Sequence, residues 1–183
     1  MIKRLREKYS DEELSRIYST PHQSWKDTDH NIRVERTIEF IDKNFDSIKN
    51  AADLSAGDAR IINSIKIEGD KYIGDFAPGY DLTGPIEKTL LEIPKVDLFI
   101  NSETLEHMDD PQDVLNRIRE KTDHLVLSTP VGKFNDTNPE HYWAWDYEGI
   151  EELLNKAGFT VFDSDVVYLA DQFVYDFQLV ACR

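Results

Sequence analysis

Two polar segments of the chain, each preceded by a short apolar run, carry the residues best suited to binding a ligand. The first, 53–59, turns through small residues into a helical pattern, and the second, 101–111, follows the apolar run at 96–100. Parallel sheets bind ligands at the carboxyl ends of their strands, where such turns bring the backbone close to the ligand. The pairing therefore predicts a site for a nucleotide-like ligand between two strand ends.

The elements that must position these segments follow from the spacing of apolar residues. From about residue 48 onward, short apolar runs alternate with helical patterns, which indicates βαβ units and a mostly parallel sheet. Two helices are well marked: Asp110 and Pro111 begin one, and Asp146 begins the other, which Gly158 closes. We expect strands at residues 48–54, 71–76, 96–100, 124–128, 159–167 and 174–181.

The first 45 residues have a helical pattern with one interruption. Ser10 and Glu13 have the form of a capping box, in which each side chain satisfies a backbone amide of the other residue. The interruption spans 19–26, and a second helix is expected from Asp29. Its apolar stripe is expected to cover one face of the sheet. The residues of that stripe are Val34, Ile38, Ile41 and Phe45.

Size and composition bound the class of protein. A chain of 183 residues that is 40% hydrophobic can bury one sizeable core. We expect one domain over 1–183, with an N-terminal helical segment at 1–47 and an α/β core at 48–183. The net charge of -15 disfavours a nucleic-acid partner, because the protein repels polyanions. Cys182 is the one cysteine, and no signal peptide or membrane span is evident, so we expect a cytoplasmic protein without an intrachain disulfide.

Four segments, in order along the chain, resemble motifs of class I S-adenosylmethionine-dependent methyltransferases of the small Glu-x-Leu-Glu-His type. The acidic loop at 53–59 resembles the first loop of that family, and 72–75 resembles the end of its second strand. The Ser-Glu-Thr-Leu-Glu-His run at 102–107 resembles the third motif. The run at 139–143, together with 157–159, resembles the approach to the last helix and the hairpin after it.

This resemblance, which covers roughly 48–183, implies a fold and an activity. The fold would be α/β, a Rossmann-like seven-stranded, mostly parallel sheet with helices on both faces and an N-terminal helical lid. Residues 76–93 are short and rich in Gly and Pro, so a compressed third-strand region is expected. The cofactor would be S-adenosylmethionine, with methyl transfer to an O, N or C nucleophile of a small-molecule acceptor. Acidity favours a cationic or neutral acceptor, and the oligomeric state stays open.

The resemblance also implies which residues hold the cofactor. Asp53 would accept hydrogen bonds from loop amides or from the amino group of the cofactor. Gly57 would allow close approach, and Asp75 would accept the ribose hydroxyls. Glu103 and Thr104 would contact the adenine or the amino acid part, although Glu103 and Glu106 could instead cap the following turn. The expected cofactor-binding residues are Asp53, Ser55, Gly57, Asp75, Phe76, Glu103 and Thr104.

Methyl transfer is an in-line displacement in which positioning supplies most of the rate enhancement, so it needs few reactive side chains. His107 is a candidate general base, because an imidazole of near-neutral pKa can remove a hydroxyl or amine proton; its alternative role is structural. His141 is a candidate for facing the acceptor. Its aromatic neighbours Trp143 and Trp145 are expected to pack the last helix against the sheet.

The interruption in the N-terminal helical pattern is a further candidate part of the site. It brings His22, Trp25 and His30 close together in the sequence. In small methyltransferases such a segment folds over the cofactor as a lid. The alternative is an ordinary loop between two helices.

Other functions find less support in the residues. No histidines and carboxylates have the tight spacing of metal ligands, so no metal site is predicted. A nucleophilic serine would need a Gly-x-Ser-x-Gly elbow, and a nicotinamide-dependent oxidoreductase would need a full Gly-x-Gly-x-x-Gly loop; the sequence has neither. Ser55 and Ala59 stand where the methyltransferase loop more often has glycine. The alternative function is therefore a non-catalytic module of the same fold that binds the cofactor or its demethylated product, or serves in protein interaction.

Overall fold

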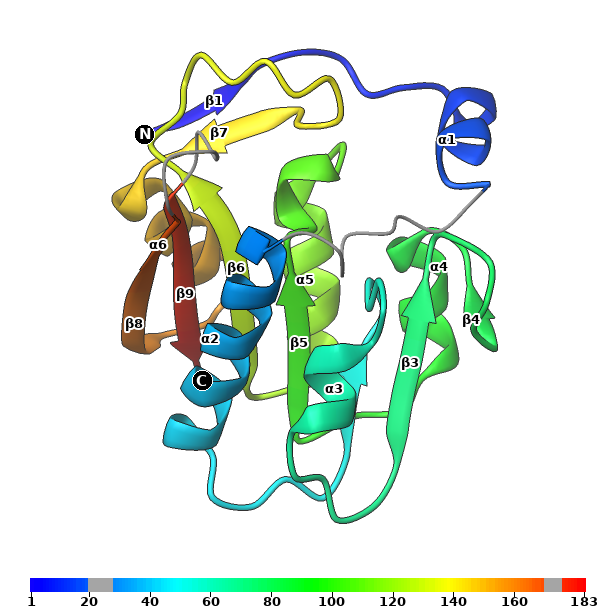
Figure 1. Cartoon of the computed structure of the whole chain (residues 1–183), viewed down its shortest axis with the longest axis vertical. Coiled ribbons are helices and arrows are strands. Elements are labelled where there is room, and N and C mark those ends of the chain that lie inside the picture. The colour runs from blue at the N-terminus through cyan, green and yellow to red at the C-terminus, as the bar shows by residue number, and fades with distance from the viewer. Residues whose placement is uncertain (20–27, 170–175) are drawn as a thin grey trace.

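A seven-stranded sheet in the order β4-β3-β2-β5-β6-β9-β8 forms the centre of the molecule (Figure 1). The computed structural model describes residues 1–19, 28–169 and 176–183, and for Asp11 it describes the backbone alone. The order and the helices on both faces confirm the predicted Rossmann-like fold. The strands are β2 (Ala51–Asp53), β3 (Lys71–Asp75), β4 (Leu82–Thr83), β5 (Leu98–Ser102), β6 (Leu125–Val131), β8 (Val161–Tyr168) and β9 (Asp176–Cys182).

The parallel part of the sheet determines where a ligand can bind. The strands β4, β3, β2, β5 and β6 are parallel to one another, whereas β9 is antiparallel to both β6 and β8. Ala52 pairs with Tyr72 on one side and with Phe99 on the other. Asp75 and Ser102 therefore end the two strands that flank β2, and their carboxyl ends meet at one edge of the sheet.

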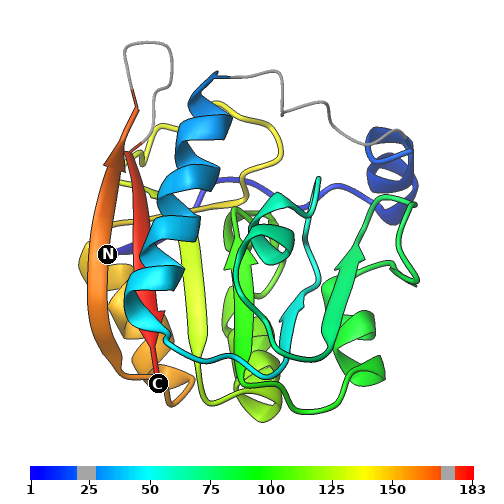
Figure 2. The same ribbon diagram turned by 60° about the horizontal axis from the view of Figure 1, so that its bottom comes forward.

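Helices cover both faces of the sheet (Figures 1 and 2). The helices α2 (Thr28–Asn44) and α3 (Arg60–Ser64) cover one face. The other face carries α4 (Ile86–Thr89), α5 (Pro111–Lys121) and α6 (Tyr147–Lys156). Within the described part of the chain, no helix combines the length and apolar character needed to cross a membrane.

Each face of the sheet has its own apolar core. Val34 and Ile41 of α2 are buried in the first core, with Ile38 and Phe45 partly buried at its margin, which confirms the predicted stripe. The second core lies under α5 and α6. Trp145 is fully buried there, as predicted from its place before the last helix. Burying a large apolar side chain of this kind stabilises the fold by roughly 1.5–3 kcal/mol.

The predicted helix starts are confirmed by their hydrogen bonds. Ser10 and Glu13 form the capping box of α1 (Asp11–Ile17), with the Ser10 amide donating to Glu13 Oε2 at 2.9 Å and the Glu13 amide donating to Ser10 Oγ at 3.3 Å. At α5 and α6 the side chains of Asp110 and Asp146 each accept a hydrogen bond from the backbone amide three residues further on. Each such cap is worth about 1 kcal/mol.

The first residues of the chain depart from the predicted helical pattern. Ile2–Arg4 form strand β1, which pairs antiparallel with β7 (Trp143–Trp145) in a separate two-stranded sheet. The helical interpretation of this segment was wrong because its pairing partner is remote in the sequence and leaves no local signal. Figure 1 shows this small sheet and α1 above the carboxyl ends of the parallel strands. The N-terminal segment thus reaches the edge where the site was predicted.

The compressed edge predicted for residues 76–93 is present. The strand β4 has two residues, and the short helix α4 follows it. β4 lies so close to β3 that a Cβ on Gly74 would be 2.6 Å from the carbonyl oxygen of Leu82. Only glycine fits at that position, directly before Asp75. Because it has no side chain, β3 and β4 can lie this close together.

Candidate functional site

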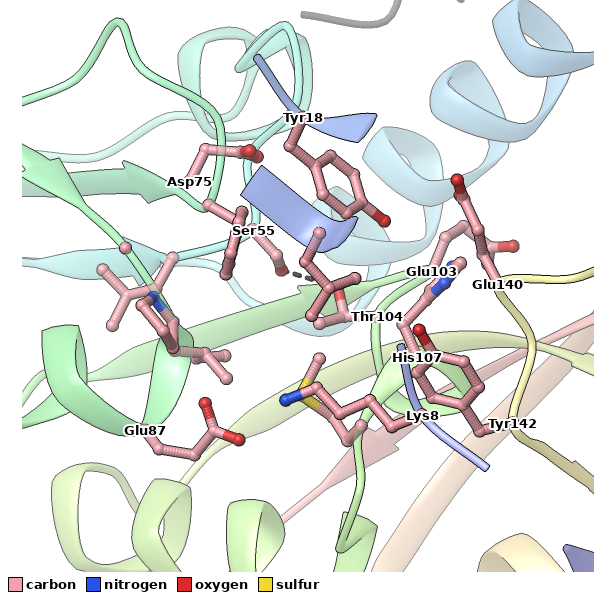
Figure 3. Close-up of a pocket in the computed structure, with 17 residues that line it drawn as sticks. Lys8, Tyr18, Ser55, Asp75, Glu87, Glu103, Thr104, His107, Glu140 and Tyr142 are labelled. Carbon is pink, nitrogen blue, oxygen red and sulfur yellow. Dashed lines mark hydrogen bonds between the residues drawn. The ribbon is translucent and has the colours of Figure 1, made fainter. Parts of the chain in front are cut away.

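Two adjoining cavities lie at the edge where the parallel strands end. Their volumes are about 230 Å³ and 220 Å³. Both are lined by Tyr18, Ser55, Asp75 and Glu103. Together the two cavities form one site, which lies where the sequence predicts a ligand. This site, called the cavity below, has two ends of different chemistry (Figure 3).

The first end, which we call the loop end, consists of Ser55, Gly57 and Asp75. Asp75 closes β3, and its Oδ2 accepts a hydrogen bond from the Gly57 amide at 2.8 Å while its Oδ1 accepts one from the Ala77 amide at 2.8 Å. The Tyr80 hydroxyl donates to the Gly57 carbonyl at 2.9 Å. The loop after β2 is thus held against the end of β3.

Asp53 is buried beneath the loop end. Its side chain is 1% exposed, and its Oδ1 accepts a hydrogen bond from the Ser55 amide at 3.2 Å. Burial raises the pKa of Asp53 to about 7; the Ser55 amide and Arg33 lower it, and Asp75 raises it further. The carboxyl group therefore changes its charge near neutral pH.

The backbone of the loop turns twice through the left-handed region. Gly57 and Ala59 both have a φ of 57°, and Ala59 is the residue directly before α3. A residue with a side chain pays roughly 1–2 kcal/mol for this conformation, whereas glycine does not. Alanine at position 59, where the methyltransferase loop more often has glycine, therefore costs conformational free energy.

Glu103 and Thr104, at the end of β5, connect the loop end to the rest of the cavity. Glu103 has a φ of 51°, and its Oε1 accepts a hydrogen bond from Ser128 Oγ at 2.8 Å. Burial raises the pKa of Glu103 to about 7, against the lowering effect of Arg33. Thr104 Oγ1 lies 2.6 Å from Ser55 Oγ (Figure 3). Left-handed residues with side chains concentrate at binding sites.

A buried cation, Arg33, lies beside this end, at a position with no role predicted from the sequence. Arg33 of α2 is 8% exposed, its Nη1 donates to Ser102 Oγ at 2.7 Å, and its Nη2 lies 3.0 Å from His30 Nδ1. Burial, helped by Arg33, lowers the pKa of His30 to about 4, so this imidazole is neutral at pH 7. His22 and Trp25, which the sequence analysis groups with His30, lie outside the described residues.

Residues 8–18 cover part of the cavity. Lys8, Leu14 and Tyr18 line it, and the ring of Tyr18 lies 5.3 Å from that of Phe76. Burial raises the pKa of Tyr18, so its hydroxyl stays protonated. This placement agrees with a covering role for the N-terminal segment, and its action as a lid stays a prediction.

The second end, which we call the histidine end, consists of Glu106, His107 and His141. Each offers one potential ligand atom, and the three atoms lie within 4.8 Å of one another. Glu106 is 1% exposed; its Oε2 accepts a hydrogen bond from Thr129 Oγ1 at 3.1 Å, and its Oε1 has no hydrogen-bond partner among the described residues. His107 Nε2 lies 3.8 Å from Glu106 Oε1.

The two histidines differ in their access to the cavity. His107 lines it, and the His141 ring lies 4.9 Å away, centroid to centroid, at 82° to the His107 ring. His141 Nδ1 lies 2.6 Å from Asp136 Oδ2, and Asn138 Nδ2 lies 3.1 Å from His141 Nε2. Because Asp136 can only accept when ionised, Nδ1 carries the proton and donates it. The catalytic roles of both histidines stay predictions, and the geometry places His107 nearer to a ligand.

The sequence located the loop end well and missed most of what surrounds it. The Glu-Thr-Leu-Glu-His run contains Glu106, but its proximity to His141 depends on long-range folding. Arg33 left a usable signal, because Arg33, Thr37 and Ile41 recur every four residues and all are buried on one face of α2. The residues missed or left without a predicted role in binding or catalysis are Lys8, Tyr18, Arg33, Glu106, Asp136 and Glu140.

Comparison with known proteins identifies the class to which this fold belongs. No protein-family model matches the sequence, and no curated protein does either. Solved structures of class I methyltransferases match nearly the whole chain. At sequence identities of 16% or less the likeness establishes the fold: the chain has the Rossmann-like methyltransferase fold.

Three of the matching structures illustrate the likeness. The 1,6-didemethyltoxoflavin-N1-methyltransferase of Burkholderia thailandensis, with bound 1,6-didemethyltoxoflavin and S-adenosylhomocysteine, is 16% identical with a TM-score of 0.74 over 100% of this chain and 94% of that one. The N-methyltransferase NodS of Bradyrhizobium japonicum, in complex with S-adenosylhomocysteine, is 12% identical with a TM-score of 0.65 over 94% and 96%. The magnesium protoporphyrin IX methyltransferase of Synechocystis, with bound S-adenosylhomocysteine, is 14% identical with a TM-score of 0.64 over 93% and 92%.

Proposed function

We propose that this protein is an S-adenosylmethionine-dependent methyltransferase that transfers a methyl group to an O, N or C nucleophile of a small-molecule acceptor. The observation that carries the proposal is the cavity at the carboxyl ends of β2, β3 and β5, in a sheet that matches those of methyltransferases. Open α/β sheets bind their ligands at this edge. The S-adenosylhomocysteine bound in the three structures named above supports S-adenosylmethionine as the cofactor.

The loop end suits the ribose and the polar part of the cofactor. Each oxygen of Asp75 accepts one backbone hydrogen bond, from Gly57 or Ala77, and because a carboxylate oxygen can accept more than one hydrogen bond, Asp75 can also accept from a ribose hydroxyl. Asp53 lines the adjoining cavity and can accept a hydrogen bond from the amino group. Gly57 presents no side chain to a ligand, which permits close approach of the backbone.

The remaining predicted cofactor residues flank this position. Phe76 and Tyr18 offer aromatic surfaces to an adenine or to a cationic sulfonium. Glu103 and Thr104 lie across the cavity and can hold either the adenine or the amino acid part. Ser55, which shares the 2.6 Å contact with Thr104, completes the set.

Catalysis in such a site depends on positioning. The acceptor nucleophile attacks the methyl carbon, the bond from that carbon to sulfur breaks, and the sulfonium becomes a neutral thioether. An acceptor O–H or N–H also loses its proton. Holding the two reactants in line and excluding water supplies most of the rate enhancement. The covering segment at 8–18 and the run at 140–142 enclose the cavity for this purpose.

The acceptor would lie at the histidine end, opposite Asp75 in Figure 3. His107, Glu140 and Tyr142 line the cavity there. The acidic lining and the net charge of -15 favour a cationic or neutral acceptor over a polyphosphate or nucleic acid. We also propose a cytoplasmic location, because Cys182 is the one cysteine of the sequence and no intrachain disulfide can form.

Calorimetric titration of the purified protein with S-adenosylmethionine, S-adenosylhomocysteine and NAD tests the cofactor. We expect micromolar binding of both sulfur ligands and no response to NAD. Asp75→Ala should weaken binding of the cofactor by roughly 1.5–3 kcal/mol, because it removes charged hydrogen bonds to the ribose. The control is Asp81→Ala, which removes an exposed carboxylate and should leave the affinity unchanged. Equal affinities for the wild type and Asp75→Ala would contradict the ribose placement.

A non-catalytic module of the same fold is the second candidate. The observation that favours it is the left-handed Ala59, which marks a loop less adapted to its cofactor than a glycine-rich one. Cofactor binding followed by methyl transfer to a panel of amine and hydroxyl acceptors would exclude the module. Failure of both sulfur ligands to bind would leave only the role in protein interaction.

A further inference from the structure

We propose that the histidine end binds one divalent transition-metal ion through Glu106, His107 and His141. These residues offer two imidazole nitrogens and one carboxylate oxygen, all within 4.8 Å of one another. Two histidines and one carboxylate form a common ligand set for Zn²⁺ and for non-haem Fe²⁺. The sequence predicts no metal site, because His141 is far along the chain from the other two residues.

The observed separations are close to those of a metal site. Two ligands of a tetrahedral ion with bonds of about 2.0–2.1 Å lie roughly 3.3–3.5 Å apart. His107 Nε2 and Glu106 Oε1 are 3.8 Å apart, so a small rotation of either side chain brings both onto one ion. The rings of His107 and His141 are already adjacent, at 4.9 Å between centroids.

Glu106 supplies a second, independent observation. The residue is 1% exposed, and its Oε1 has no hydrogen-bond partner among the described residues. A buried carboxylate is costly unless a cation or a metal compensates it. Arg33 directs its Nη1 to Ser102 instead. The other oxygen of Glu106 is fixed by Thr129, whose hydroxyl accepts a hydrogen bond from the buried Trp145 Nε1 at 3.1 Å. The carboxylate is thus held in place with one bare oxygen toward the histidines.

Asp136 gives His141 the support typical of a metal-binding histidine. Metal-ligating imidazoles commonly donate their second ring N–H to a carboxylate, which fixes the tautomer and the ring orientation. His141 Nδ1 lies 2.6 Å from Asp136 Oδ2, in a pair that is almost fully buried. This arrangement leaves Nε2 as the ligand atom. That nitrogen now accepts a hydrogen bond from the Asn138 amide at 3.1 Å, and an ion would take its place.

An ion at this position would face the main cavity, because His107 lines it. Three protein ligands leave at least one coordination position for an exogenous oxygen or nitrogen. Bound there, a hydroxyl acceptor would be polarised and more acidic. This last step rests on the proposed function, whereas the metal site itself does not. The histidines would then act as ligands and not as general bases.

Titration of the chelator-treated full-length protein with Co²⁺, followed by its visible absorption, tests the site. We expect one equivalent of Co²⁺ to give an absorption band and one equivalent of Zn²⁺ to remove it. His141→Ala and Glu106→Gln should lose the band, and Asp136→Asn should weaken the affinity about 10–100-fold. The control is His124→Ala, because His124 lies away from the cavity against Phe45 and should leave binding unchanged.

Several outcomes would overturn the proposal. One is a wild-type protein that shows neither the Co²⁺ band nor heat on calorimetric titration with Zn²⁺. Another is His141→Ala binding Co²⁺ as tightly as His124→Ala does. Far-UV circular dichroism excludes misfolding as the cause, and Glu106→Gln preserves side-chain volume. A parallel titration with S-adenosylmethionine separates the two proposals, since metal binding without cofactor binding refutes only the methyltransferase, and the reverse refutes only the metal site.

Discussion

The carboxylates at the loop end and at the histidine end of the cavity differ in their hydrogen bonds. At the loop end both oxygens of Asp75 accept backbone hydrogen bonds, and its partner Gly57 is 18 residues away in the sequence. At the histidine end Glu106 keeps one oxygen without a hydrogen-bond partner among the described residues, and its neighbour His141 comes from a remote segment. The first end completes its own polar groups within a βαβ unit. The second keeps one buried carboxylate oxygen without a hydrogen-bond partner among the described residues, and there we propose a metal ion.

The largest effect that tests this contrast is expected at Asp53, under the loop end. Burial raises the pKa of Asp53 to about 7 in the folded protein, from a usual value near 4. Between those two pH values the folded protein holds a proton that the unfolded chain has released. Stability therefore falls as pH rises from about 4 to 7 and is flat above that range. Over the roughly three pH units, the ionisation of Asp53 costs about 2–4 kcal/mol.

Asp53→Asn should remove this loss, because the amide stays neutral and its oxygen can still accept from the Ser55 amide. Urea denaturation at pH 5 and at pH 8 measures it. We expect the stability of the variant relative to the wild type to rise by roughly 2–3 kcal/mol between pH 5 and pH 8, because about two of the three pH units of the loss lie in that interval. Asp75, Asp58 and Arg33 surround Asp53 in both proteins, so the two differ only in the group at position 53. A difference that does not change with pH would mean that Asp53 is ionised throughout.

The sequence predicts the parts of this molecule whose signals are local. The strand positions, the capping box at Ser10 and the helix starts at Asp110 and Asp146 are set by neighbours within a turn or a strand, and the structure confirms them. The loop end is readable for the same reason, since Asp53, Gly57 and Asp75 belong to one βαβ unit. Whether these residues bind the cofactor stays a prediction.

The parts that the sequence misses depend on pairing between remote segments. Ile2–Arg4 form a strand only because Trp143–Trp145 lie beside them, and three residues are too few to show a period of two. The proximity of His141 to Glu106 follows from the same placement of the segment before β7. A search for metal ligands at close sequence spacing cannot find such a pair. The chemistry of the histidine end therefore becomes visible only in three dimensions.

A middle-sized effect is expected at Thr129, behind the histidine end. Its hydroxyl donates to Glu106 Oε2 and accepts from Trp145 Nε1, each at 3.1 Å. Thr129→Val keeps the shape and leaves both buried partners unpaired, which should cost roughly 1–3 kcal/mol of unfolding free energy. Urea denaturation measures the loss. Calorimetry should show an unchanged affinity for S-adenosylmethionine, because the variant lies outside the loop end.

The control for Thr129→Val is Thr89→Val. Thr89 is as deeply buried as Thr129, at 1% against 0% exposed, but its hydroxyl makes only a long contact of 3.4 Å with the Ile86 carbonyl. We expect a loss well below that of Thr129→Val. Equal losses of unfolding free energy in the two variants would show that burial of any hydroxyl matters more than its hydrogen bonds. The Thr129 hydroxyl would then not stabilise the carboxylate of Glu106 as we propose.

The smallest effect is expected at Ala59, where the loop end is less than ideal. Its φ of 57° strains a residue with a side chain by roughly 1–2 kcal/mol, and Ala59→Gly relieves that strain. Glycine also makes the unfolded chain more flexible, which costs about 0.4–1 kcal/mol. Ala59 is also buried in the core under α2, so losing its methyl group costs about 0.8 kcal/mol more, and the net change should be close to zero. Ala56→Gly, in the same loop but without a positive φ, should lose its methyl contact with the same core and pay the flexibility cost, with no strain to relieve, and be destabilised. A comparison of the two variants by urea denaturation thus isolates the strain, and equal losses in both would mean that Ala59 adopts its left-handed conformation at no cost.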